Sequence, residues 1–281
     1  MQIITKVKRM QERSDHMRSQ GKTIVFVPTM GFLHDGHLSL MREGKTYGDD
    51  LVASIFVNPT QFAPGEDLAS YPIDVERDLE LIHDVGVDAV FIPNTNEMYG
   101  KNFQTYVNVE KLSNHLCGIS RPIFFRGVAT IVTKLFNIVK PHVAVFGQKD
   151  YQQLIVIRQM VREFDLDIEI VGAPTIREPD GLAMSSRNTY LTTDQRVSAL
   201  SLYQSMKKAQ EAIDKGEQDA TRIIDTTREF IQSRSDTEID YISICDLDTL
   251  INVKTIDKPV LMALAVKVGK ARLIDNMILS P

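Results

Sequence analysis

Two histidines three positions apart mark the stretch of this sequence with the clearest chemical potential. His34 and His37 close the run from Val27 to His37, which also holds a proline and two glycines. An apolar run precedes this stretch and a helical pattern follows it, so the histidines fall where a helix begins. Helix starts bind phosphate through free N–H groups and partial positive charge. We interpret the stretch as a nucleotide-phosphate site; half of a metal site and ordinary surface histidines are the alternatives.

Two further polar turns carry groups that suit phosphate chemistry. Gly147 to Asp150 follows another apolar run and contains Lys149, either a point charge for phosphate or an exposed lysine. Asp150 is either a metal or ribose partner or the cap of the following helix. Met184 to Asn188 lacks apolar periodicity, and its Arg187 could grip phosphate oxygens with two N–H groups. This segment is either a mobile loop that closes over phosphates or a plain linker.

The elements that would position these turns alternate between strand and helix. Alternation of this kind indicates a doubly wound parallel sheet. In the common strand order 3-2-1-4-5, the first and fourth strands are neighbours, so the histidine turn and the Lys149 turn should share one crevice. Strands are expected at 23–27, 51–57, 87–92, 142–146 and 168–171, with a short extra one at 106–109, and helices at 1–20, 38–43, 74–85, 128–139 and 151–163.

The character of the chain changes near residue 175. A polar, turn-rich segment comes first, and a helix then begins with a possible capping box at Thr192 and Gln195. A second helix is expected at 219–233. Strands are expected at 239–244, 260–268 and 272–279, without alternation. The expected fold is α/β: a Rossmann-like doubly wound parallel sheet over residues 1–175 and a smaller C-terminal α+β domain over 176–281.

Net charge, cysteine content and the length of the apolar runs limit the classes to which this protein can belong. The net charge of −5 argues against nucleic acid as a partner. The two cysteines, Cys117 and Cys245, form no disulfide framework and indicate a reducing compartment. No targeting segment is visible, and the apolar run 260–266 is far shorter than a membrane span. We expect a cytoplasmic protein with neither a nucleic-acid nor a membrane partner.

Several motifs together resemble one enzyme family. His34-Asp35-Gly36-His37 and Met184-Ser185-Ser186-Arg187 are similar to the paired motifs of the nucleotidyltransferase superfamily. Within it, the chain resembles the pantothenate synthetase family over most of 23–191, and it does so at the following motifs: Pro28 to Gly31, Asn58 to Phe62, Asp67-Leu68 with Tyr71-Pro72, Arg121-Pro122, Gly147 to Gln153 and Asp180 to Asn188.

The resemblance implies a set of site residues. The catalytic group would be His37, His34, Lys149 and Arg187. ATP would contact Met30, Gly31, Phe32, Leu33, His34, Asp35, Gly36, His37, Gly147, Gln148, Lys149, Asp150, Ile176, Met184, Ser185, Ser186 and Arg187. Pantoate would contact Gln61 and Gln153, with Asn58 in support, and Gln61 would also lie near β-alanine.

The implied reaction is condensation of pantoate with β-alanine, driven by ATP with Mg²⁺ and passing through a pantoyl adenylate. AMP and pyrophosphate would leave. No tightly bound organic cofactor is implied, a homodimer is expected, and the metal ligands are not readable. Two positions depart from the family: Gln148 stands where glutamate is more frequent, and Phe124 where histidine often occurs. A different nucleotidyltransferase and a non-catalytic nucleotide-binding regulator are the rival hypotheses.

Overall fold

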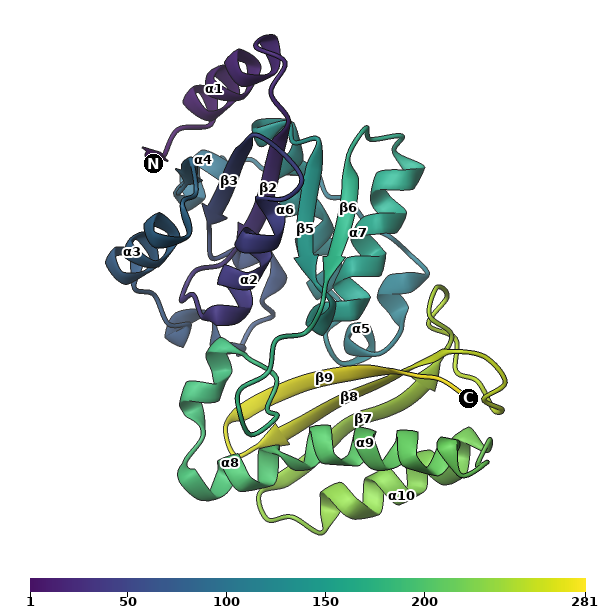
Figure 1. The fold of residues 1–281 in the computed structure, drawn as a ribbon. Helices are drawn as coiled ribbons and strands as arrows, with labels where there is room; N and C mark the ends of the chain where they lie inside the picture. Colours follow the sequence, from purple (N-terminus) through teal and green to yellow (C-terminus); the bar gives the residue numbers. More distant parts are fainter. The chain divides into compact units, whose positions relative to one another are not determined.

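The computed structural model describes residues 1–281 as two compact units. The first comprises Met1–Ser113, Arg121–Gln148 and Gln153–Pro174. The second comprises Asn114–Ser120, Lys149–Gln152 and Thr175–Pro281. The second unit therefore includes two short segments that come before residue 175, whereas the predicted division places all residues before 176 in the first domain. Each unit has its own sheet (Figure 1).

The first unit is built on a parallel sheet in the order β1-β4-β3-β2-β5-β6. Apart from the edge strand β1, this is the predicted order 3-2-1-4-5. The pairing of β2 with β5, through Val25 with Val143 and Phe26 with Ala144, makes the predicted first and fourth strands neighbours. The strands are β1 (Gln2–Ile4), β2 (Ile24–Thr29), β3 (Asp50–Ile55), β4 (Ala89–Phe91), β5 (Val143–Gly147) and β6 (Glu169–Ala173).

Helices cover both faces of this sheet because alternate residues of a strand point to opposite sides. Val25 and Val27 of β2 share a core cluster with Leu38 and Met41 of α2. On the other face, the ring of Phe26 meets that of Phe136 in α6 at 6.5 Å. The helices of four or more residues are α1 (Val7–Ser19), α2 (Asp35–Gly44), α3 (Val75–Val85), α4 (Thr95–Met98), α6 (Phe124–Val139) and α7 (Tyr151–Glu163).

Two predictions for the first unit are wrong. The N-terminal residues were expected to be helical throughout, but 2–4 form β1, whose partner is the distant β4. Residues 106–109 form no strand. The N–H of Val107 donates to Oγ1 of Thr130 in α6 at 3.0 Å, so this segment is bonded to a helix and not to the edge of a sheet. The strand β2 also extends beyond its predicted end, through Pro28 to Thr29. Proline has no N–H to donate, and it is tolerated here because the pairing of β2 with β5 is confined to Val25 and Phe26.

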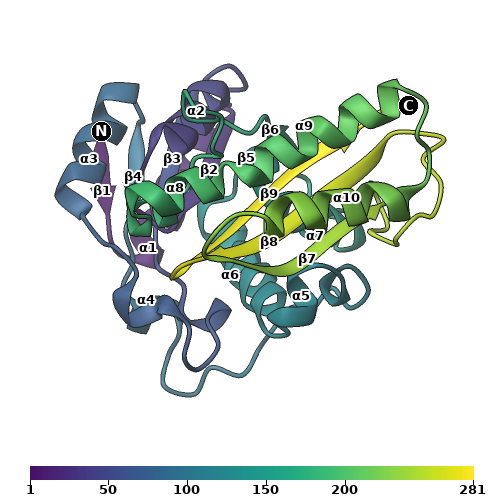
Figure 2. The same ribbon diagram turned by 90° about the horizontal axis from the view of Figure 1, so that it is seen from below.

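The second unit contains an antiparallel sheet in the order β7-β8-β9 with helices against one face (Figure 2). The predicted capping box is confirmed at Thr192 and Gln195. The helix that was expected to run on from there is interrupted at Leu200, so three helices instead of two lie between Thr192 and the sheet. The elements are α5 (Cys117–Ser120), α8 (Thr193–Ala199), α9 (Ser201–Asp214), α10 (Ala220–Gln232), β7 (Thr237–Cys245), β8 (Val260–Val268) and β9 (Ala271–Leu279).

Candidate active site

The two histidines lie at the first turn of α2 and are bonded to its backbone. His34 is the residue that caps the helix, and its Nδ1 accepts the N–H of Gly36 at 3.2 Å. Nδ1 of His37 accepts the N–H of His34 at 3.4 Å, and the two ring centroids are 4.1 Å apart. In a neutral imidazole the nitrogen opposite the acceptor carries the proton. The arrangement therefore favours the tautomer in which Nε2 of each histidine is a donor.

A buried carboxylate holds the turn that leads into these histidines. Asp78 of α3 is 1% exposed, and its two oxygens accept the N–H groups of Phe32 and Leu33, each at 2.7 Å. Burial raises the pKa of this carboxyl, while the two N–H donors and Arg77 act in the opposite direction. A Cβ at Gly31, where φ is +86°, would approach Asp78 Oδ2 to 3.0 Å. The carboxylate thus fixes the path of three residues predicted to contact ATP.

Sequence reasoning assigned no role to Asp78. The signal was its place in the apolar stripe of α3, three residues after Val75 and four before Ile82. A carboxylate at such a position is buried and needs donors to compensate its charge. Its donors come from a segment 45 residues earlier, and a single sequence does not show that pairing.

The predicted amide residues form a buried group beside the same turn. Asn58 is 1% exposed and Gln61 is 7% exposed, and Nδ2 of Asn58 donates to Oε1 of Gln61 at 2.9 Å. Nε2 of Gln61 lies 3.2 Å from Sδ of Met30. One predicted pantoate residue therefore touches one predicted ATP residue. Gln153 lies half-buried in α7, and its proximity to Gln61 stays a prediction.

Arg121 braces the loop that carries Gln61. Its guanidinium pairs with the Glu66 carboxylate, at 2.7 Å from Nε and 2.5 Å from Nη2, and donates to the carbonyl of Gln61 at 3.1 Å. The same guanidinium lies 4.0 Å from the ring centroid of Phe124, where it makes a cation–π contact. The departure at Phe124 thus gives Arg121 an aromatic surface.

The turn after β5 divides between the two units. Gly147 and Gln148 belong to the first, in which Gln148 donates to the carbonyl of Gly172 at 3.1 Å. Lys149 and Asp150 belong to the second; their charged groups are 3.8 Å apart. An amide can donate to a carbonyl and a carboxylate cannot, so the departure at Gln148 has a structural consequence inside the first unit.

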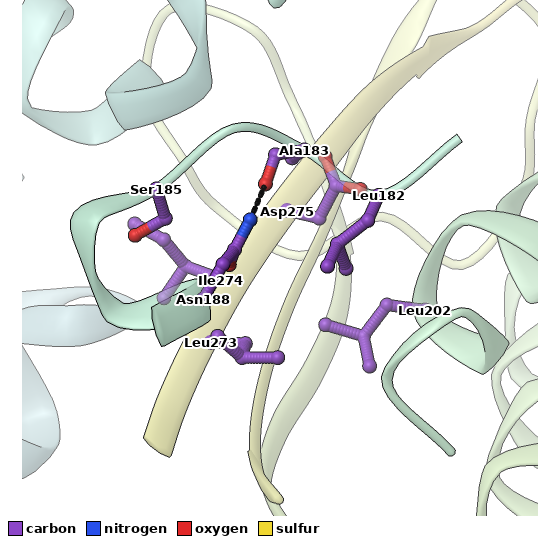
Figure 3. Close-up of a pocket in the computed structure, with 8 residues that line it drawn as sticks. All are labelled: Leu182, Ala183, Ser185, Asn188, Leu202, Leu273, Ile274 and Asp275. Carbon is purple, nitrogen blue, oxygen red and sulfur yellow. Dashed lines mark hydrogen bonds between the residues drawn. The ribbon is translucent and has the colours of Figure 1, made fainter. Parts of the chain in front are cut away.

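The segment from Ile176 to Asn188 is part of the second unit and makes specific contacts within it, and its closure over phosphates stays a prediction. Arg177 makes a two-pronged ion pair with Asp275 of β9, at 2.6 and 3.0 Å, and its guanidinium lies 3.9 Å from the Tyr203 ring centroid. Asn188 donates to the carbonyl of Ala183 at 3.0 Å, a bond drawn in Figure 3.

Figure 3 also shows the small pocket beneath this segment. Its lining consists of Leu182, Ala183, Ser185, Asn188, Leu202, Leu273, Ile274 and Asp275. Of the four residues from Met184 to Arg187, only Ser185 lines this pocket. Its Oγ accepts the N–H of Arg187 at 3.3 Å, which fixes the start of the short helical turn that carries the guanidinium.

The structure brings together the histidine turn, Met30, Asn58 and Gln61 in the first unit. Lys149 and Arg187 belong to the second unit, so their convergence on the histidines stays a prediction. No group of three or more histidine, cysteine, aspartate or glutamate side chains is arranged to hold a metal ion. None of the helices combines the length and apolar character needed to cross a membrane.

Comparison with known proteins decides the family. A family model described as Pantoate-beta-alanine ligase matches residues 2–278. The chain belongs to the pantoate-β-alanine ligase family. Pantothenate synthetase of Desulfatibacillum aliphaticivorans is 58% identical over 281 residues, which is all of both chains. That of Syntrophus aciditrophicus is 54% identical over 98% of this chain and 96% of its own length.

Solved structures agree with this assignment. Pantothenate synthetase from Thermus thermophilus has a TM-score of 0.94 and 39% identity over all of both chains. A pantoate-β-alanine ligase from Francisella tularensis, complexed with β-γ ATP and β-alanine, has a TM-score of 0.81 and 32% identity, covering 99% of this chain and 97% of its own. The Rossmann-like fold and the predicted family are confirmed. As a pantoate-β-alanine ligase, the chain condenses pantoate with β-alanine.

Proposed function

We propose that this ligase activates pantoate with ATP as a pantoyl adenylate. In the first step a pantoate carboxylate oxygen attacks the α-phosphorus, the bond from that phosphorus to the bridging oxygen breaks, and pyrophosphate leaves. In the second step the β-alanine amine attacks the acyl carbon, the bond to the phosphate oxygen breaks, and AMP leaves with one proton released from nitrogen. The complex reported for the Francisella tularensis relative, with β-γ ATP and β-alanine, supports the substrates.

The observation that carries this proposal is the bonding of the two histidines at the N-terminus of α2. With Nδ1 of His34 and His37 facing backbone N–H groups, the donating nitrogen of each ring is Nε2, which would meet phosphate oxygens. Donors fixed before the reaction stabilise charge that develops in the transition state. Lys149 adds a point charge, and Arg187 adds a planar fork that suits phosphate. No enzyme nucleophile is needed, so positioning and electrostatics supply the rate.

The division of roles follows from the chemistry of each part. The catalytic domain, residues 1–175, would bind ATP and pantoate, and residues 176–281 would act as a lid. Neutral amides at Gln61 and Gln153 suit pantoate, because they bond its oxygens without neutralising the attacking carboxylate. The ATP contacts proposed are Met30 to His37, Gly147 to Asp150, Ile176 and Met184 to Arg187.

Mg²⁺ is proposed to enter with ATP. The chain offers no cluster of side chains for a resident metal, and Mg²⁺ is ordinarily held by substrate phosphates, water and one or two carboxylates. Asp150, whose carboxylate lies 3.8 Å from the Lys149 ammonium, is proposed as a carboxylate for such a contact. When bound, the ion neutralises charge on the phosphates.

Isotope labelling tests the adenylate. Pantoate labelled with ¹⁸O in its carboxylate is incubated with the protein, ATP, MgCl₂ and β-alanine. One ¹⁸O should appear in AMP for each pantothenate formed, because the acyl–oxygen bond breaks in the second step. Without β-alanine, labelled pyrophosphate should exchange into ATP only when pantoate is present. Formation of ADP, or ¹⁸O in inorganic phosphate, would refute the proposal.

A homodimer in the cytoplasm completes the proposal. Both cysteines are buried and free, which suits a reducing compartment. Sedimentation equilibrium tests the assembly; a species of 31.7 kDa at all concentrations would show a monomer.

A further inference from the structure

The side-chain amide of Asn58 has one orientation that satisfies its neighbours. Its Nδ2 lies 3.2 Å from the main-chain carbonyl oxygen of Gly127 in α6, which can only accept. The NH₂ group must therefore face α6. The opposite end, Oδ1, lies 2.6 Å from the hydroxyl of Tyr99, which donates to it.

The orientation of the Asn58 amide determines the orientation of the Gln61 amide. The second hydrogen on Nδ2 of Asn58 points to Oε1 of Gln61 at 2.9 Å. Because Oε1 is committed to Asn58, the Gln61 amide must direct Nε2 the other way, where Sδ of Met30 lies at 3.2 Å. A thioether is a weak acceptor. An incoming oxygen therefore meets an N–H donor on Gln61, and an inverted amide would present an acceptor instead.

We propose that Tyr99 is a positioning residue that acts through Asn58 to keep Gln61 turned with Nε2 toward an oxygen of pantoate. This inference rests on the proposed function of Gln61. Without the Tyr99 hydroxyl, Oδ1 of Asn58 keeps only donors from Thr60, the side chain at 2.9 Å and the N–H at 3.4 Å. The Gly127 carbonyl still accepts from Nδ2, but Asn58 has lost the shortest bond to Oδ1. Its amide is then less firmly held, and the inverted form of Gln61, which repels a carboxylate, becomes more populated.

The surroundings of Tyr99 suit a fixed donor. Its ring packs edge-on against Phe103 with centroids 4.8 Å apart and lies 6.2 Å from the ring of Phe56. Burial raises the pKa of Tyr99 to about 12, so the hydroxyl keeps its proton at neutral pH. Tyr99 thus has the rigidity and the proton that the role requires.

Steady-state kinetics of Tyr99→Phe test the proposal, because this change removes only the hydroxyl. The KM for pantoate should rise about fivefold to tenfold, the factor that corresponds to one net hydrogen bond, and the KM for ATP should stay within about twofold. Tyr106→Phe is the matched control, since Tyr106 is 45% exposed and also lies against α6 through Arg126; its kinetics should match the wild type. A merely structural role of Tyr99 would lower the melting temperature and leave the pantoate KM unchanged, which would overturn the proposal.

A double-mutant cycle separates this inference from the function on which it rests. In a Gln61→Ala background, Tyr99→Phe should change the pantoate KM by less than about twofold, because the group it orients is gone. A full additive effect in that background would show that Tyr99 acts by another route. If Gln61→Ala alone leaves the pantoate KM unchanged, the assignment of Gln61 itself fails. If Gln61→Ala raises this KM and Tyr99→Phe does not, only the role of Tyr99 fails.

Discussion

The carboxylate of Asp78 accepts the backbone N–H of Leu33 at 2.7 Å and thereby ties α3 to the turn that leads into α2. Its other oxygen accepts the N–H of Phe32, which adopts a left-handed backbone conformation with φ of +50°. Left-handed backbone is costly for a residue with a side chain and persists only where neighbours enforce it. Asp78 supplies that enforcement just before the first histidine of the candidate site.

Replacing Asp78 tests whether this turn must be fixed for catalysis. Asp78→Asn exchanges one acceptor for an NH₂ group that opposes a backbone N–H, so one buried donor loses its partner. We expect turnover to fall at least about tenfold and the free energy of unfolding to fall by about 1–3 kcal/mol. Asp84→Asn, on the same helix with a side chain 82% exposed, is the control for a lost carboxylate. Normal turnover of Asp78→Asn would show that the turn holds its geometry unaided.

The proposed phosphate donors predict large losses of rate. His37→Ala and Lys149→Ala should each lower turnover by about 10²-fold, the scale of one lost transition-state contact. Pantothenate formation at saturating substrates measures this directly. His83→Ala, with a side chain 72% exposed on α3, should behave as the wild type. Near-normal turnover in both site variants would remove these residues from the mechanism.

Gly127 tests the packing between α6 and the loop that carries Gln61. A Cβ at this position would lie 2.3 Å from the carbonyl oxygen of Thr60 and 2.7 Å from the Cα of Gln61. Gly127→Ala must push the loop away, so we expect a loss of about 1–3 kcal/mol in stability and a severalfold higher KM for pantoate.

Gly100→Ala provides the control for Gly127, because a Cβ there meets nothing within 4 Å. Urea denaturation and pantoate titration of the two variants should differ clearly. Equal behaviour of Gly127→Ala and Gly100→Ala would mean that the loop yields without affecting the site.

The ion pair between Glu66 and Arg121 predicts a pH dependence of stability. Burial alone would raise the pKa of Glu66, but the Arg121 guanidinium, with the N–H of Ala63, outweighs burial and holds the pKa below the ordinary value of 4.5. A carboxyl with a lowered pKa in the folded state stabilises the fold above the unfolded pKa, and this contribution is lost as pH falls through the folded pKa.

Urea denaturation of the wild type and Glu66→Gln between pH 3 and pH 7 measures this contribution. The wild type should be the more stable of the two above about pH 4.5, and the difference should shrink as the solution becomes more acidic. A difference that is constant over this range would show that the pair contributes nothing through ionisation.

Local pattern was sufficient for most of the fold. Helix α7 begins and ends where its pattern predicts, at Tyr151 and Glu163. The prediction succeeds because the amphipathic period of a helix depends only on residues close together in the sequence. The neighbouring positions of β2 and β5 followed from the rules that govern connections between parallel strands. The motifs at His34, His37 and Arg187 also stand in short runs whose residue types suit phosphate, and their binding of phosphate stays a prediction.

The sequence by itself therefore determined the order of the strands other than β1, the helix start that carries the histidines and the family that the motifs resemble. Only the tertiary structure decided which side chains hold that machinery in place: β1 exists because β4 offers it a partner, Asp78 reaches a turn 45 residues away, and Tyr99 reaches Asn58 across 41 residues. The physical reason is that a buried polar group must find donors or acceptors wherever the fold brings them. Such pairings leave no periodic trace in the chain.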